Sequence, residues 1–194
     1  MIVPLNITTQ NRAVAILTPK QTTAILEQLN TDYKLRTGYL LQTAMRISEA
    51  VYVSKHPECF REENSVIFLP MVKGMGKEKC TIKNRQIMLS PNGVVAVKEF
   101  LKKEVGLSAY QNMEAAYKLA AIKADFDPKY ITTKMWRKTM ISWLMNIYPE
   151  RQGQIAFSAG HDYNTMRTHY LTYGFRKEDV QDMRKELVGW GNVE

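Results

Sequence analysis

The side chains in this sequence that are suited to chemistry are cations and one tyrosine. Guanidinium groups keep their charge and bind phosphate oxygens through paired hydrogen bonds. A phenol acts as a nucleophile where neighbouring cations favour its ionised form, although its unperturbed pKa is near ~10. Together these groups are suited to nucleophilic attack on a phosphodiester. The segments that carry them contain Arg46, Lys73 and Lys77, Lys134 and Arg137, and His161, with Tyr170 nine residues further along.

Motifs of several other enzyme classes are missing from the sequence. There is no GxxxxGK followed by Ser or Thr, so Gly74–Lys77 is not a nucleotide-binding P-loop. There is no HExxH or GxSxG motif, and no Cys/His cluster. The histidines at 56, 161 and 169 are not spaced with carboxylates as metal ligands are. We see no acidic cluster of the kind that metal-dependent nucleases use. The sequence therefore predicts neither a metal nor a cofactor.

The elements that must position these residues indicate an α+β fold, mostly α-helical with one small antiparallel sheet. Residues 1–17 have no clear period, and we expect an arm there. Thr18 and Gln21 form a capping-box pattern that begins the first helix. A stripe of apolar residues predicts one helix over 34–52, which carries Arg46 and Glu49 as surface neighbours. Strands are predicted at 65–70, 80–82 and 85–89, and the Gly- and Lys-rich turn between the first two reads as a hairpin.

After Pro91 the sequence indicates helices to its end. The first of these helices has the apolar stripe Val94, Val97, Leu101 and Val105, and the second has the cap Ser108 and the apolar residues Ala115, Leu119 and Ile122. The third begins at the cap Thr132 or Thr133, and its inward-facing residues are Trp136, Met140, Trp143, Leu144 and Ile147. The tail has Val180, Met183 and Leu187 at helical spacing. Residues 18–194 are thus predicted to be one domain that includes a tail helix over 175–190. The tail helix suits either a closing core helix or a contact with a neighbouring protomer.

Composition favours an anionic partner. The chain has 194 residues, a formal net charge of +8 and 45% hydrophobic residues. Its pI is about 9.4, which makes nucleic acid the first candidate partner. Apolar runs are too short to cross a bilayer, and the N-terminus lacks the pattern of a secretion signal. Cys59 and Cys80 read as ordinary thiols, so we expect a cytoplasmic, DNA-associated protein and no membrane partner.

The order of the chemical segments resembles the catalytic domain of the tyrosine recombinases, the phage-type integrases. That family carries an Arg in a TGxRxSE helix, a Lys in a β-hairpin, an HxxR helix, an LGH turn and a nucleophilic Tyr about nine residues later. The resemblance covers roughly Thr18 to Tyr173. Lys134 replaces the first residue of HxxR, a variant that resembles archaeal viral and plasmid integrases, and the turn reads Ala159-Gly160-His161.

The resemblance implies a metal- and ATP-independent recombinase that cleaves and rejoins double-stranded DNA through a 3′-phosphotyrosyl link. Tyr170 would be the nucleophile, with Tyr163 and Tyr173 as rivals, and Lys73, or else Lys77, the general acid. The groups on the phosphate would be Arg46, Arg137 and His161, with Lys134 in the place of the family histidine and Glu49 holding Arg46 or Lys134.

The resemblance also implies assembly, as a homo-oligomer on DNA with a tetramer in synapsis, and an origin in a mobile element. Family members usually have a separate N-terminal helical domain. Only about seventeen residues precede the first predicted helix, so we expect a fragment or an unusually short enzyme.

Other interpretations of the sequence predict different behaviour. A type IB topoisomerase-like enzyme would relax supercoils instead of exchanging strands. A non-catalytic DNA-binding protein on the same fold would form no covalent adduct. A helical protein-interaction domain with a basic surface would not bind DNA in a salt-dependent way.

Overall fold

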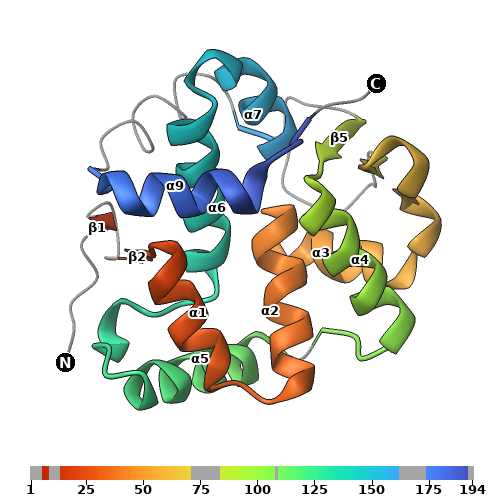
Figure 1. Cartoon of the computed structure of the whole chain (residues 1–194). Coiled ribbons are helices and arrows are strands. Elements are labelled where there is room, and N and C mark those ends of the chain that lie inside the picture. Colours follow the sequence, from red (N-terminus) through yellow and green to blue (C-terminus); the bar gives the residue numbers. More distant parts are fainter. Residues whose placement is uncertain (1–5, 9–13, 71–83, 108, 162–173, 192–194) are drawn as a thin grey trace.

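The structure, a computed structural model that describes residues 6–8, 14–70, 84–107, 109–161 and 174–191, is mostly helical, with a small antiparallel sheet at one side (Figure 1). The predicted strand at 80–82, the cap at Ser108 and the candidates Lys73, Lys77 and Tyr170 lie outside the described residues. The strands are β1 Asn6–Thr8, β2 Val14–Ile16, β3 Phe60–Arg61, β4 Val66–Leu69 and β5 Arg85–Met88. The helices are α1 Pro19–Glu27, α2 Thr31–Thr43, α3 Ile47–Lys55, α4 Pro91–Lys103, α5 Tyr110–Lys123, α6 Lys134–Ile147, α7 Gln152–Ala159 and α9 Lys177–Leu187.

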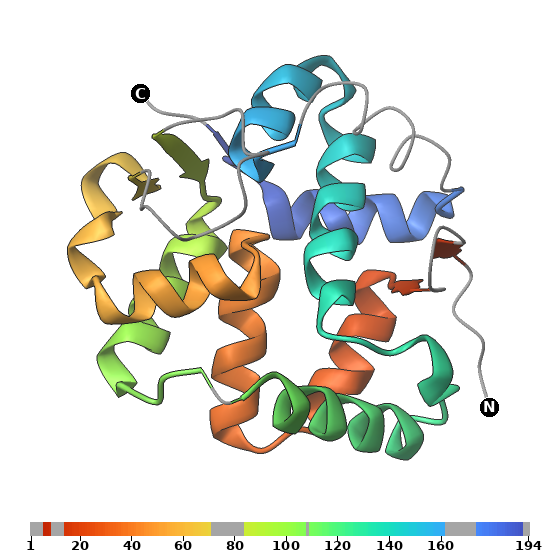
Figure 2. The ribbon, with the colours of Figure 1, turned by 180° about the vertical axis from the view of Figure 1, so that it is seen from behind.

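The helix α6 is the centre of the core. It contacts β2, α2, α7 and α9, and it stands in front of α9 in Figure 2, where Figure 1 shows α9 in front. Trp136, Met140 and Trp143 of α6 are at most 1% exposed, as their helical spacing predicts. Tyr117 of α5 meets Trp136 edge to face with ring centroids 5.4 Å apart. Helix α6 can therefore hold its first turn, which carries Arg137, in a fixed place.

Strands β3, β4 and β5 form an antiparallel sheet in that order, which confirms the predicted α+β class. Ile67 of β4 pairs with Ile87 of β5, and both side chains are buried. Successive side chains of a strand alternate between the two faces of the sheet. Arg85 therefore lies on the same face of β5 as Ile87, and it is only 4% exposed.

The last residues of the predicted arm, 14–17, pack against helix α6. β1 and β2 form a second antiparallel pair, in addition to the one sheet that we expected. Leu17 is buried, its N–H donates to Thr139 Oγ1, and its carbonyl accepts from Trp143 Nε1 at 2.8 Å. The capping box predicted at Thr18 is present at the start of α1.

The prediction of one helix over 34–52 was wrong, because the chain turns between α2 and α3. Ala44 has φ 48°, in the left-handed region that ends helices. Its carbonyl accepts a hydrogen bond from Arg137 Nη1 on α6. The N–H of Arg46 donates to Glu49 Oε2 at 2.8 Å, which begins α3 as the second half of a capping box does. Tertiary hydrogen bonds thus interrupt a pattern that favours a continuous helix.

The apolar stripe that we identified on α5 faces solvent. Leu119 and Ile122 are 56% and 53% exposed. Met113, Tyr117, Ala120 and Ala121 are buried instead. Tyr117 accepts a hydrogen bond from Thr37 and packs on Trp136, and burying this large ring rotates the aliphatic stripe outward.

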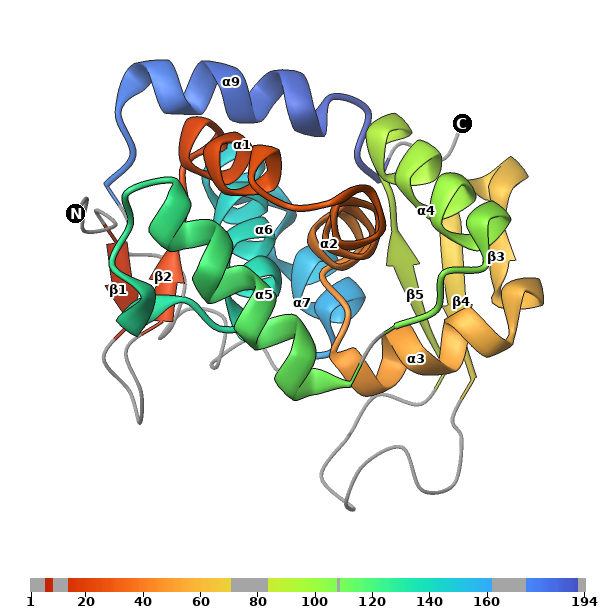
Figure 3. The same ribbon diagram turned by 90° about the horizontal axis from the view of Figure 1, so that it is seen from below.

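The C-terminal helix closes the core of its own chain. Met183 and Leu187 of α9 are buried, and α9 contacts α1, α4 and α6. Beyond the helix, Trp190 Nε1 donates to the carbonyl of Met88 on β5 at 3.0 Å, and its ring stacks on Tyr148. α9 lies on the opposite side of the molecule from α3 (Figure 3). In the parts of the chain that the structure describes, no helix has the length and apolarity to cross a membrane.

Candidate active site

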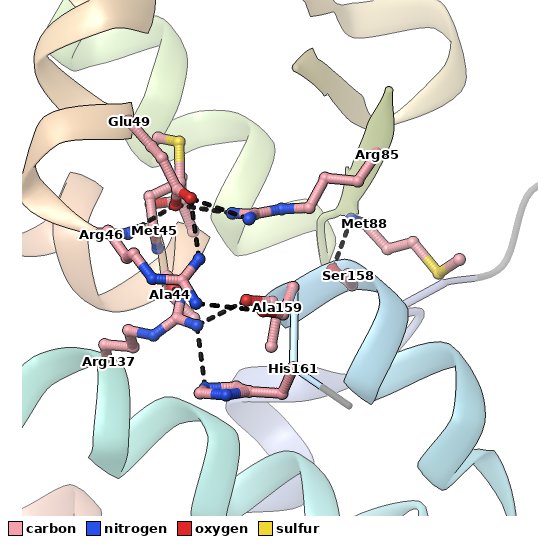
Figure 4. A network of polar contacts seen from close by, with 12 residues as sticks. Ala44, Met45, Arg46, Glu49, Arg85, Met88, Arg137, Ser158, Ala159 and His161 are labelled. Carbon is pink, nitrogen blue, oxygen red and sulfur yellow. Dashed lines mark hydrogen bonds and ion pairs between the residues drawn. The ribbon is translucent and has the colours of Figure 1, made fainter. Parts of the chain in front are cut away.

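Four elements that are far apart in the sequence meet at one point (Figure 4). They are the α2–α3 junction, the first turn of α6, the C-terminal end of α7 and the start of β5. Strand β5 and α7 are joined by a hydrogen bond from the N–H of Met88 to Ser158 Oγ. The carbonyls of Ala44, Ala159 and Gly160 lie among the charged side chains of these elements and accept hydrogen bonds from them.

Arg46 is held at both of its terminal nitrogens. Its Nη1 donates to Glu49 Oε1 at 2.9 Å, and its Nη2 donates to the carbonyl of Gly160 at 3.0 Å. A guanidinium carries five N–H donors, so these two bonds leave others for an anion. The side chain is 42% exposed, so the group is fixed on one side and open to solvent on another.

The carboxylate that holds Arg46 is itself held by a second arginine. Arg85 donates from Nη1 and Nη2 to the two oxygens of Glu49, at 2.8 and 2.6 Å. Such a bidentate pair fixes the plane of the carboxylate. Burial alone would raise the pKa of Glu49, but Arg85 and Arg46 together hold the pKa of that carboxyl below its usual value. Glu49 is therefore a buried anion between two arginines.

Gly160 provides the space that these arginines occupy. It ends α7 with φ +65°, a conformation that favours glycine. A Cβ on Gly160 would lie 2.2 Å from Arg85 Nη1 and 3.3 Å from Arg46 Nη1. Both guanidiniums thus pass directly over the Gly160 backbone, and the turn that precedes His161 requires glycine for two independent reasons.

Arg137 and His161 lie on the α6 side of the same point. Arg137 Nη2 donates to the carbonyl of Ala159 and lies 2.9 Å from His161 Nε2. A guanidinium only donates hydrogen bonds, so the Nε2 atom of His161 is the acceptor in this contact. For Nε2 to donate to an anion, it would have to separate from Arg137.

The structure brings together Arg46, Glu49, Arg137 and His161, which come from three of the predicted segments. Lys134 is exposed at the first position of α6, and the partners of Glu49 in the described residues are Arg46 and Arg85 rather than Lys134. Burial and the charge of Lys134 lower the pKa of Lys138, one turn further on.

Arg85 is a site residue that the sequence analysis missed. The signal was present, because alternation along 85–89 places Arg85 on the face of the buried Ile87 and Leu89. Arginine is almost never fully buried unless it is paired. A buried arginine in a strand therefore required an acidic partner, and Glu49 lies 36 residues earlier in the chain.

The cluster is strongly cationic. Two guanidiniums, from Arg46 and Arg85, bind the one carboxylate of Glu49, and a third, from Arg137, lies on the carbonyl of Ala159, next to the Gly160 carbonyl that Arg46 contacts. Guanidiniums in such an array bind phosphate well because their charge is permanent and their donors lie in one plane. The arrangement is chemically suited to hold a phosphodiester and to stabilise charge that develops on its non-bridging oxygens.

The fold is similar to solved structures of DNA recombinases. The structure of the XerA recombinase matches 93% of this chain with a TM-score of 0.61 and 14% sequence identity. Two structures of the Tn1549 transposon integrase, in complex with transposon right-end DNA and with circular-intermediate DNA, match 89% and 90% of it with TM-scores of 0.64 and 18% identity. No family model and no curated protein sequence matches the chain.

These comparisons establish the class of fold. The chain shares its fold with parts of the XerA recombinase and Tn1549 integrase structures. It spans 66% to 67% of the length of the chains in those structures.

Proposed function

We propose that the chain is the catalytic domain of a tyrosine recombinase, a site-specific enzyme that cleaves and rejoins double-stranded DNA. The single observation that carries the proposal is the convergence of Arg46, Arg137 and His161 on the C-terminal end of α7. This convergence occurs in a fold shared with a recombinase and a transposon integrase. The matched integrase structures contain DNA, which supports DNA as the partner.

The arginines would act on the scissile phosphate. Attack on a phosphodiester increases the negative charge on its non-bridging oxygens. Arg46 and Arg137 would bind these oxygens through N–H groups that the protein already holds in place, so little reorganisation is needed during the reaction. His161 would add a further donor once its Nε2 carries a proton.

The bond changes balance without a metal or ATP. The phenolic oxygen of Tyr170 would attack phosphorus, release its proton to solvent and form a 3′-phosphotyrosyl bond. The bond between phosphorus and the 5′-oxygen would break, and Lys73, or else Lys77, would give that oxygen a proton. The 5′-hydroxyl of a second strand would then attack the phosphotyrosyl link and return its proton to the neutral lysine. The departing tyrosine oxygen would take a proton from solvent, so that the DNA is rejoined and the phenol is restored.

Finer features of the proposal rest on the sequence resemblance. Lys134 would occupy the position of the family histidine, as in archaeal viral and plasmid integrases. We propose an integrase of a mobile element that assembles on DNA, as a tetramer in synapsis. Contacts to phosphates would dominate its affinity, so binding should weaken steeply as salt concentration rises.

The experiment that tests this function is covalent trapping on a nicked suicide DNA duplex in the presence of a chelator. The wild-type chain should form a protein–DNA adduct that survives denaturation, and Tyr170→Phe should not. An adduct that persists in Tyr170→Phe would move the nucleophile to Tyr163 or Tyr173. Salt-dependent binding without any adduct would indicate a non-catalytic DNA-binding protein. Relaxed circles without exchanged strands would indicate a topoisomerase-like activity.

A further inference from the structure

Arg85 is the most deeply buried charged side chain in the arginine cluster. Its side chain is 5% exposed, compared with 42% for Arg46. The residue begins β5, on the sheet that packs against α7. Removing a guanidinium from water is costly unless its hydrogen bonds are made. A group buried to this extent beside a proposed phosphate site needs an explanation in terms of what it contacts.

What Arg85 contacts is the group that orients Arg46. Each oxygen of Glu49 accepts one hydrogen bond from each arginine: Oε1 from Arg46 Nη1 and Arg85 Nη1, and Oε2 from the Arg46 N–H and Arg85 Nη2. Arg46 alone would hold each oxygen by a single hydrogen bond. The two bonds from Arg85 double these contacts and fix the plane of the carboxylate.

Arg85 also supports the second anchor of Arg46. That anchor is the carbonyl of Gly160, which accepts from Arg46 Nη2. A Cβ at Gly160 would lie 2.2 Å from Arg85 Nη1 and 3.0 Å from its Cζ, so the Arg85 guanidinium packs directly on this turn. Two contacts, with Glu49 and with the Gly160 carbonyl, thus set the plane of the Arg46 guanidinium, and Arg85 touches both of these partners.

We propose that Arg85 is a positioning residue, which acts through Glu49 and the Gly160 turn to hold the Arg46 guanidinium in the orientation for binding the scissile phosphate. This inference rests on the proposed function. Arg85 is too deeply buried to be the phosphate ligand itself, and the exposed Arg46 is the group that meets the anion. The net charge around Glu49 follows from the same arrangement, because one carboxylate cannot neutralise two guanidiniums.

The test combines adduct formation on the nicked suicide duplex with NMR of the arginine side chains. The variants are Arg85→Met, which removes the charge at similar length, and Arg85→Lys, which keeps the charge without the bidentate fork. The matched control is Arg184→Met, an exposed arginine on α9, on the side of the molecule opposite α3. Thermal unfolding of each variant shows whether it is folded at the assay temperature.

We expect Arg85→Met to form adduct about 100-fold more slowly than wild type, the size of effect that a misplaced group causes. Arg85→Lys should be intermediate and Arg184→Met unchanged. Because Arg85 acts in part through Glu49, Arg85→Met and Glu49→Gln together should slow the reaction by clearly less than the product of their separate effects. Multiplied effects in the double variant, or a wild-type rate in folded Arg85→Met, would overturn the proposal.

The NMR measurement decides the positioning role whether or not the chain cleaves DNA. In protein labelled with ¹⁵N-arginine, the Nη signals of Arg46, assigned with Arg46→Lys, should show slow rotation in wild type and free rotation in Arg85→Met or, if that variant is unfolded, in Arg85→Lys. Unchanged Arg46 signals in the folded variant would refute the inference. Absence of adduct in wild type would refute the proposed function alone.

Discussion

Gly160→Ala is the substitution whose effect can be worked out most directly from the structure. Gly160 has φ +65°, and an alanine in the left-handed region costs about 1–2 kcal/mol. The added Cβ would also lie 2.2 Å from Arg85 Nη1, and Arg85 cannot withdraw without breaking its pair with Glu49. Steric overlap of this kind typically costs about 1–3 kcal/mol.

The two contributions together predict a loss of about 2–5 kcal/mol in the free energy of unfolding. For a domain of this size, that loss corresponds to a fall in Tm of roughly 4–20 °C. Urea denaturation followed by circular dichroism measures the free energy, and calorimetry measures the Tm. Displacement of Arg85 by the new methyl group should also change the NMR signals of the Arg46 Nη atoms.

The control is Gly153→Ala, seven residues earlier in the same helix. A Cβ on Gly153 would have no neighbour within 4 Å, and the residue lies inside α7. Alanine is a better helix former, so this variant should gain about 0.5–1 kcal/mol. If Gly160→Ala were as stable as wild type while Gly153→Ala behaved as expected, the close approach of Arg85 to the turn would be refuted.

Three further measurements test other parts of the account. The lowered pKa of Glu49 contributes stability that is present above its usual pKa, 4.5, and is lost as pH falls through the lower folded value, so urea titrations should show a steeper acid loss in wild type than in Glu49→Gln; equal slopes would contradict the ion-pair assignment. Trp190→Ala removes a ring that is 2% exposed and should cost about 3–5 kcal/mol by calorimetry, whereas a loss under 1 kcal/mol would mean that the tail is not docked. On α5, Leu119→Gln should change the free energy of unfolding by less than about 0.5 kcal/mol, and Met113→Ala should lower it by about 2–5 kcal/mol. A larger loss in Leu119→Gln than in Met113→Ala would show that the face with Leu119 is the buried one.

The elements of the fold that could be predicted are those whose signals are local. The capping box at Thr18 begins α1, and the apolar spacing of α6 buries Trp136 and Trp143 as expected. The helical spacing in the tail likewise places Met183 and Leu187 in the core. In each case a few neighbouring residues carry both the propensity and the pattern, so tertiary structure adds to the signal without reversing it.

The features that could not be predicted depend on partners far along the chain. The turn at Ala44 is held by Arg137, 93 residues later, and the apolar stripe over 34–52 continues through it. The face of α5 is set by Trp136, so the stripe containing Leu119 misleads. The candidate site shows the same division: alternation along 85–89 signals that Arg85 is buried, while its partner Glu49, 36 residues earlier, is known only from the structure.

Mapping the covalent link shows whether Tyr170 attacks a phosphate that the arginine cluster holds. The wild-type chain is incubated with a nicked suicide duplex, digested with protease and nuclease, and analysed by mass spectrometry. We expect a nucleotide attached to Tyr170, with the yield lowered at least about 100-fold in Arg137→Ala. A nucleotide on another residue, or a yield that does not depend on Arg137, would contradict it.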